Sequence, residues 1–175
     1  VFVEIKSIKT SSSSTSINSK NTIKSLEAYL KATANCQVGN AKIKKLVDKL
    51  TKGLKTQKAK ANAIFKYVRD TLSYSFYYDT KYGAVGTLNA KKGNCVDHSH
   101  LLAAMFRTAK LPTRYVHGTC KFTSGSTYGH VWVQVLIDGT WTVADATSSK
   151  NSLGKIGKWN TKTYKRNGYY SSLSF

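Results

Sequence analysis

The 175-residue chain contains one proline, one methionine and only eight acidic residues. No apolar run approaches the roughly 18–20 residues that a membrane-spanning helix needs, which excludes an integral membrane protein. Residues 1–10 also lack a long apolar stretch, so we expect no secretory leader. The chain does not begin with methionine, which is consistent with a fragment of a longer protein.

The chain has three cysteines, which are too few for a disulfide framework and, as an odd number, cannot all be paired. Cys36 and Cys120 are expected to be buried, either free or joined to each other, and at least one thiol of the chain stays free. Neither a CxxC pair nor an HExxH segment is present, so the sequence predicts no zinc site. We expect His98 and His100 to lie at the surface or to support a site rather than to bind metal.

Positive charge dominates the composition. The 28 lysines and arginines outnumber the eight acidic residues and give a formal net charge of +20. Such an excess favours an acidic partner, although a lysine-biased composition can arise without function. Only four of the cations are arginines, and no nucleic-acid-binding motif is present. The charge therefore indicates non-specific attraction and no specific recognition of nucleic acid.

We predict an N-terminal segment or linker over residues 1–17, followed by one domain over residues 18–175 that is large enough for an enzyme. The polar run TSSSSTS at residues 10–16 has the composition of a linker. Residues 1–8 alternate weakly and are predicted to be a strand or the end of an upstream module.

Helical periodicity comes first along the domain and strand patterns follow it. Helices are predicted at residues 21–33, 41–52, 58–70 and 96–110. Strands are predicted at residues 113–122, 130–137 and 140–144. The aromatic segment 72–82 alternates as a strand does, and residues 79–92 are predicted to be a loop. This order predicts an α+β fold.

The dipeptide Asp138–Gly139 predicts a two-residue hairpin turn between the last two strands. That register places Asp145 opposite Trp132, and His130 lies on the same face two residues before Trp132. His130 and Asp145 become diagonal neighbours with β-carbons about 7 Å apart or less. A carboxylate at that distance can orient an imidazole and stabilise its charged form.

Cys95 lies where the helix over residues 96–110 is predicted to begin. The helix dipole favours a thiolate at that end, and the unpaired N–H groups of the first turn can bind an oxyanion. Each of Cys95, His130 and Asp145 alone has an ordinary structural interpretation. Together they predict nucleophilic catalysis by a cysteine paired with an imidazole.

Four segments in this order resemble the transglutaminase-like cysteine peptidase superfamily: GNCVD (93–97), LPTR (111–114), GHVW (129–132) and WTVAD (141–145). The resemblance implies a transglutaminase-like or papain-like fold, with N-terminal helices packed on an antiparallel sheet and the nucleophile at a helix N-terminus. It also implies Cys95 as the nucleophile, His130 as the acid and base, and Asp145 as the residue that orients His130.

Within that superfamily, the linker TSSSSTS and the segment YLKATANCQVGN (29–40) are similar to those of the pseudomurein endoisopeptidases of viruses that infect methanogens. The resemblance implies hydrolysis of the isopeptide bond between an alanine carbonyl and a lysine ε-amine, through a thioester. No cofactor is needed for that chemistry. Dependence on a divalent cation such as Ca²⁺ is implied as well, but no DxDxDG-type loop places one here.

Many relatives supply a second oxyanion donor from an upstream side chain, and Tyr82 and Asn89 are the candidates in this sequence. Trp132 is predicted to wall the substrate cleft or to fill the core. The expected partner is the acidic wall polymer pseudomurein, approached by a monomer that does not insert into membranes. The resemblance implies synthesis in the host cytoplasm and action at the cell wall on lysis.

Two other functions remain open. A protein-glutamine transglutaminase would use the same three residues with an amine in place of water. A basic module that binds a wall polymer or nucleic acid would retain these residues in an inactive site.

Overall fold

The computed structural model describes residues 3–4 and 17–175. The predicted linker, residues 10–16, lies outside the described residues. Four α-helices form: α1 (Ala41–Thr51), α2 (Gln57–Thr71), α3 (Gly83–Ala90) and α4 (Cys95–Thr108). A single 3₁₀ turn, η1 (Glu27–Tyr29), precedes them in the described residues.

The C-terminal half of the chain supplies most strands of an antiparallel sheet, whose strand order is β1-β8-β5-β6-β7-β2. Its strands are β1 (Val3–Glu4), β2 (Ser19–Lys20), β5 (Thr113–Lys121), β6 (Thr127–Ile137), β7 (Thr140–Ala144) and β8 (Lys165–Tyr170). A second, parallel pair joins β3 (Ser73–Tyr74) to β4 (Lys92–Gly93), immediately before α4. The predicted α+β architecture is confirmed.

The β6–β7 hairpin has the register that the sequence predicts, with Ile137 opposite Thr140. Asp138 and Gly139 both adopt positive φ, 48° and 80°. Two consecutive positive φ values are those of a type I′ turn, whose twist matches that of the flanking strands.

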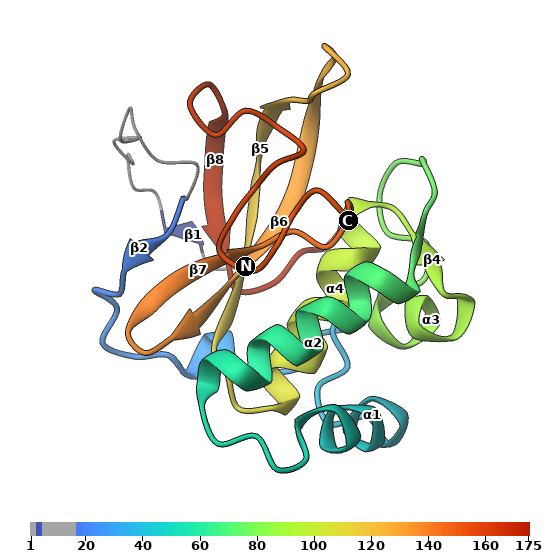
Figure 1. Ribbon diagram of the computed structural model, residues 1–175, viewed down its shortest axis with the longest axis vertical. Helices are drawn as coiled ribbons and strands as arrows, with labels where there is room; N and C mark the ends of the chain where they lie inside the picture. Colours follow the sequence, from blue (N-terminus) through green and yellow to red (C-terminus); the bar gives the residue numbers. More distant parts are fainter. Residues whose placement is uncertain (1–2, 5–16) are drawn as a thin grey trace.

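Helix α4 is the centre of the helical layer. Figure 1 shows α1, α2 and α4 gathered on one side of the sheet. Almost the whole of α4 is buried, because α1, α2 and α3 cover it on one side and β5 and β6 on the other. The alternate β6 residues Val131, Val133 and Val135 join this core.

A second, smaller core lies around the indoles of Trp132 and Trp159, whose ring centroids are 4.9 Å apart. Val116, Cys120 and Tyr169 belong to it. Strand neighbours such as Val131 and Trp132 therefore serve different cores, as expected for side chains that alternate between the faces of a strand.

All three cysteines are free, so the Cys36–Cys120 disulfide that the sequence left open does not form. The two thiols are buried in different cores, Cys36 with the helices and Cys120 beside Trp132.

Two predictions of local structure are wrong. Residues 21–33 form only the turn η1, because Tyr29 and Leu26 pack around Trp141 in an irregular connection. Residues 79–92 contain helix α3 rather than a loop. Gly86 lies inside this helix, where an added Cβ would come within 3.0 Å of the Tyr82 side chain.

Candidate active site

Cys95 is the first residue of α4, as the sequence predicts. Asn94 caps the helix: its side-chain oxygen accepts a hydrogen bond from the Asp97 N–H at 2.9 Å. The thiol residue is only partly buried, and it lines a cavity together with His130. The one partly exposed cysteine of the chain therefore stands at a helix N-terminus, next to a histidine.

His130 and Asp145 meet across the β6–β7 hairpin. Nε2 of His130 lies 2.8 Å from Oδ2 of Asp145, and both side chains are almost fully buried. The predicted register brings these two residues together, as expected for diagonal neighbours on one face. Because Asp145 engages Nε2, Nδ1 is the ring nitrogen that remains for Cys95.

The Asp145 carboxylate has more partners than the sequence predicts. Nε1 of Trp159 donates to Oδ2 at 2.8 Å, and the backbone N–H and hydroxyl of Thr147 donate to Oδ1 at 3.1 and 2.6 Å. Burial alone would raise the pKa of Asp145. The charge and hydrogen bond of His130, together with those from Thr147 and Trp159, hold it far below its ordinary value.

The His130 imidazole is correspondingly stabilised in its charged form. Burial lowers its pKa, but the charge and hydrogen bond of Asp145, joined by a hydrogen bond with Cys95, raise it to about 10. The site therefore favours an imidazolium beside a cysteine, the arrangement that nucleophilic cysteines require.

Aromatic rings hold the His130 imidazole in place. The Trp132 ring stacks against it, with centroids 5.8 Å apart and planes 26° apart, and the Phe122 ring meets it edge-on at 5.1 Å. Trp132 is 1% exposed and does not line the cavity. Trp132 therefore fills the core and does not form a wall of the cleft, the two positions that the sequence left open.

Tyr74 faces the first N–H of α4. Burial and the neighbouring charges of Cys95 and Asp145 raise the pKa of this phenol to about 12, while a hydrogen bond from the Cys95 backbone N–H opposes the rise. The phenol oxygen thus lies beside the N–H group that the sequence predicts as an oxyanion donor. The feature of the sequence that could have pointed to Tyr74 is the alternation of aromatic residues in segment 72–82.

Neither of the two candidates for the second donor reaches the cavity. Asn89 lies near the end of α3, where its side chain accepts a hydrogen bond from Lys42. Tyr82 packs its ring 6.3 Å from that of Tyr77 and is not among the residues that line the cavity around Cys95. The tyrosine that does line this cavity is Tyr74, which lies opposite Gly93 where β3 pairs with β4 ahead of Cys95.

Asp97, two residues after Cys95, anchors the loop beside the site. Its buried carboxylate accepts hydrogen bonds from the hydroxyls of Tyr77 and Thr80 and from the backbone N–H groups of residues 81–83. Burial alone would raise the pKa of Asp97, but these hydrogen bonds lower it. The carboxylate thus fixes the segment that begins just after Tyr74.

The two histidines of α4 lie in the interior and not at the surface, one of the two locations expected from the sequence. His98 and His100 are buried, and their Nδ1 atoms contact the Asn94 carbonyl oxygen and the Tyr115 hydroxyl. Within residues 3–4 and 17–175, no group of three or more His, Cys, Asp or Glu gathers as a ligand set.

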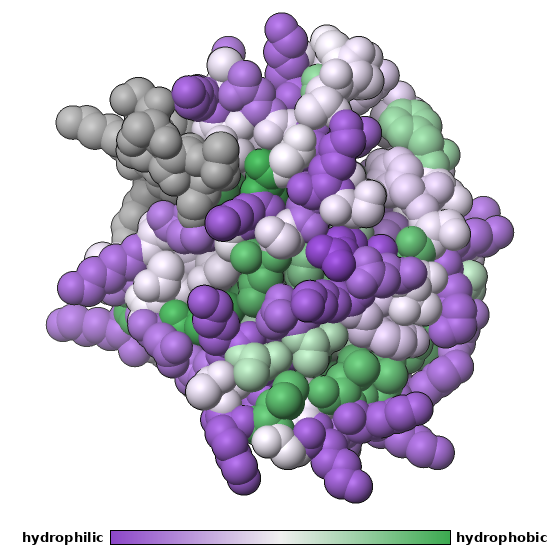
Figure 2. Space-filling view, viewed as in Figure 1, coloured by the Kyte–Doolittle hydropathy of each residue, from purple (hydrophilic) through white to green (hydrophobic). Residues whose placement is uncertain are grey.

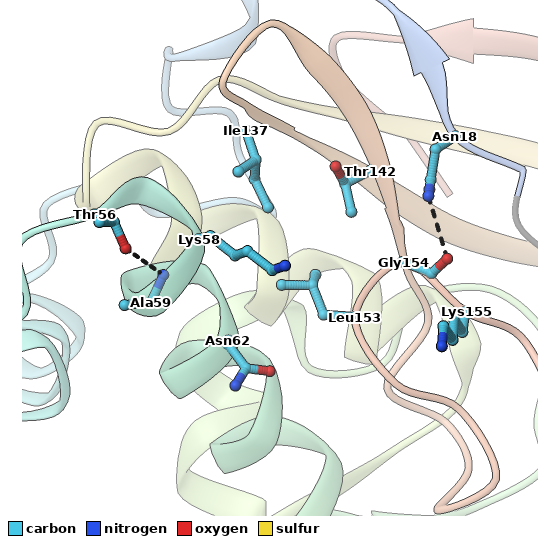
Figure 3. Close-up of a pocket in the computed structure, with 10 residues that line it drawn as sticks. All are labelled: Asn18, Thr56, Lys58, Ala59, Asn62, Ile137, Thr142, Leu153, Gly154 and Lys155. Atoms are coloured by element: carbon cyan, nitrogen blue, oxygen red, sulfur yellow. Dashed lines mark hydrogen bonds between the residues drawn. The ribbon is translucent and has the colours of Figure 1, made fainter.

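A larger cavity lies elsewhere, between α2 and the β6–β7 hairpin (Figure 3). Its volume is about 620 Å³, and its lining includes Asn62, Lys58 and Lys155 but neither cysteine nor histidine. It lacks the groups for nucleophilic catalysis, so the candidate active site is the cleft at Cys95.

Comparison with known proteins agrees with this geometry. The family model of the transglutaminase-like superfamily matches residues 44–146, a span that contains Cys95, His130 and Asp145. A search of curated proteins found no match.

Two solved structures share the fold. A Cytophaga hutchinsonii protein assigned as a cysteine protease is 24% identical with a TM-score of 0.60, over 81% of this chain and 53% of that one. The periplasmic domain of TgpA from Pseudomonas aeruginosa, bound to ethylmercury, is 21% identical with a TM-score of 0.51, over 68% and 47%. The chain thus spans about half the length of these proteins.

The raised pKa of His130 and the lowered pKa of Asp145 make stability depend on pH. The contribution of His130 is complete below its unfolded value of 6.5 and is lost as the pH rises through about 10. The contribution of Asp145 is complete above its unfolded value of 3.8 and is lost as the pH falls through the lower native value. The pair therefore stabilises the fold throughout the neutral range.

Replacing Asp145 by asparagine should release the His130 proton. Burial then dominates, so the ring should be neutral at about pH 8, where the wild-type ring is charged. Imidazole nitrogen chemical shifts measured by NMR report this change. The matched control is Asp138→Asn at the exposed hairpin turn. A His130 ring that stays charged in Asp145→Asn would contradict the assignment.

Asp97→Asn should destabilise the protein by about 3–5 kcal/mol, because an amide cannot accept hydrogen bonds from every donor around this buried carboxylate. Urea unfolding measures the change. Asp48→Asn, which removes an exposed pair with Lys44 on α1, is the control and should cost at most about 1 kcal/mol. Equal effects of the two substitutions would show that Asp97 is not a loop anchor.

Proposed function

Because the chain belongs to the transglutaminase-like superfamily, we propose that it is a cysteine endoisopeptidase that hydrolyses the alanine–(ε)lysine cross-links of pseudomurein. The observation that carries the proposal is the convergence of Cys95, His130 and Asp145 at one cleft. The thiol comes from a helix start and the other two groups from a hairpin. Hydrolysis of an amide by this set proceeds through a thioester.

In the first step, Sγ of Cys95 attacks the alanine carbonyl carbon and the carbonyl π electrons move to oxygen. We assign the Cys95 N–H and the Tyr74 hydroxyl, which lie beside each other, as the donors to that oxyanion. His130 then gives its Nδ1 proton to the departing lysine nitrogen, the C–N bond breaks, and a thioester and a free amine remain.

In the second step, water attacks the thioester. His130 takes a proton from the water, the C–S bond breaks, and Cys95 leaves as a thiolate beside the charged imidazole. Asp145 keeps the ring oriented through both steps, supported by Trp159 and Thr147.

The basic surface supports an anionic wall polymer as the partner of a monomeric enzyme. The formal net charge is +20, and Figure 2 shows hydrophilic side chains projecting around the outline of the molecule. Such a charge raises the rate of encounter with an acidic polymer. No helix among the described residues is long and apolar enough to cross a membrane.

The alternative is a transglutaminase, since Cys95, His130 and Asp145 support transfer of the acyl group to an amine equally well. The family description, transglutaminase-like, is compatible with both outcomes. The acceptor distinguishes them: water gives hydrolysis, and an amine gives a new amide.

Cys95→Ala should reduce the release of lysine ε-amines from purified pseudomurein on the order of 10⁴-fold, because no other described side chain at the cleft can form the thioester. Binding of the variant to intact walls should persist. Mass analysis of the released fragments and a wall pull-down measure the two properties, with Cys120→Ala as the control for a buried thiol.

Undiminished release by Cys95→Ala would overturn the mechanism. Incorporation of a labelled amine into a glutamine-bearing protein, faster than hydrolysis, would instead establish the transglutaminase. Wall binding without any Cys95-dependent reaction would indicate a binding module with an inactive site.

A further inference from the structure

Exposed aromatic side chains gather at the cleft. The large hydrophobic side chains that are exposed in the described residues all line the chamber that contains Cys95: Tyr74, Phe76, Tyr78, Tyr128 and Phe175. Phe76 is 65% exposed and Tyr78 is 85% exposed. Apolar area left in water contributes nothing to folding, so its concentration around one thiol indicates a surface that binds a ligand.

The cleft has two adjoining chambers. The first, about 220 Å³, is lined by both Cys95 and His130. The second, about 370 Å³, is lined by His130 but not by Cys95. Phe76 and Tyr128 line both, with ring centroids 6.3 Å apart, and mark the boundary between the chambers.

The chemistry of acyl transfer assigns a side of the scissile bond to each chamber. The carbonyl carbon must reach Sγ of Cys95, so the acyl half occupies the smaller chamber. The departing nitrogen must reach His130, which is the proton donor and lines both chambers. With the acyl half in the smaller chamber, the amine half extends past His130 into the larger one.

The larger chamber offers a narrow set of contacts. Its walls include the rings of Phe76, Phe122 and Tyr128, and Lys158 is the one lysine or arginine that lines either chamber. No carboxylate lines the larger chamber. Ser124 and Thr147 complete the lining with hydroxyl groups. Rings pack against methylene groups, and a lysine ammonium group pairs with an anion.

The backbone of Lys158 is fixed relative to the triad. The buried side chain of Asn151 accepts hydrogen bonds from the N–H groups of Gly157 and Lys158 at 2.9 and 3.0 Å, and it donates to the Asp145 carbonyl oxygen at 3.1 Å. Asn151 thus ties the backbone of Lys158 to that of Asp145. Because this backbone is already fixed, the Lys158 side chain loses less conformational entropy when it pairs with a ligand.

We propose that the larger chamber binds the amine half of the substrate as a chain of methylene groups whose far carbon carries a carboxylate, with the rings around the chain and Lys158 paired with the carboxylate. A lysine joined through its ε-nitrogen has this form, with its α-carboxylate at the far end. The assignment rests on the proposed function, because it takes the sides of the bond from the roles of Cys95 and His130.

Three model amides test the subsite. Each carries an acetyl-alanyl group on one amine: the ε-nitrogen of Nα-acetyl-lysine, the ε-nitrogen of Nα-acetyl-lysinamide, or pentylamine. Wild-type kcat/KM should be about tenfold higher for the carboxylate than for the carboxamide, as expected for a charge pair in an apolar setting. Lys158→Met should reduce this ratio to about one, and Lys158→Arg should retain most of it.

Lys155→Met is the matched control, an exposed lysine three residues away that does not line the cleft, and it should leave the ratio unchanged. Phe76→Ala and Tyr128→Ala should lower kcat/KM for all three amides by a similar factor, while Tyr128→Phe should not. A wild-type ratio of one, or a ratio that survives in Lys158→Met, would overturn the proposal.

Binding separates this proposal from the proposed function. Calorimetry on Cys95→Ala should show tighter binding of the carboxylate amide than of the carboxamide, and the double variant with Lys158→Met should lose the difference. Such binding without hydrolysis of any amide by the wild type would contradict the isopeptidase alone. Equal binding of the two amides would contradict the subsite alone.

Discussion

The hydrogen bond between His130 and Asp145 is the contact on which the site depends. It spans the β6–β7 hairpin, so it exists only in the register that the Asp138–Gly139 turn sets. A slip of one residue would turn Asp145 to the opposite face of its strand. Two charges buried this deeply are costly unless their remaining hydrogen-bonding groups are satisfied, and Trp159 and Thr147 satisfy those of Asp145.

Local patterns predicted the parts of the molecule that depend on local physics. The hairpin follows from one dipeptide, and α1, α2 and α4 follow from periodicity and from residues at their ends. The same local patterns were enough to predict Cys95 at the start of α4 and His130 and Asp145 as diagonal neighbours. Residues 21–33 failed because a helical spacing of apolar residues does not exclude an irregular segment packed around a tryptophan.

Contacts between distant segments were beyond the sequence. Trp159 reaches Asp145 only because the chain returns after residue 145, and Tyr74 reaches Cys95 only because β3 pairs with β4. Nothing local in the sequence showed that a loop folds around Asp97. These residues set the environment of the site, whereas Cys95, His130 and Asp145 set its chemistry.

Charge and recognition are divided between different parts of the surface. The net charge of +20 belongs to the chain as a whole, yet Lys158 is the one lysine or arginine lining the two chambers at the reactive residues. Long-range attraction by the lysines needs no defined geometry. In our proposal, the aromatic rings of the chambers and Lys158 select the substrate bond that reaches Cys95, because these groups act only at contact distance.

The segment that carries Phe76 and Tyr78 is fastened at both ends. On one side, Ser73 and Ser75 donate backbone hydrogen bonds to residues 91 and 93, and on the other, the N–H groups of residues 81–83 converge on Asp97. Between the two fastenings, Tyr77 and Thr80 also bond to Asp97, whereas the side chains of Phe76 and Tyr78 are exposed and can change without shifting Tyr74 or the thiol. Substitution at these two rim positions can therefore alter which ligand fits the cleft while Cys95, His130 and Asp145 keep their places.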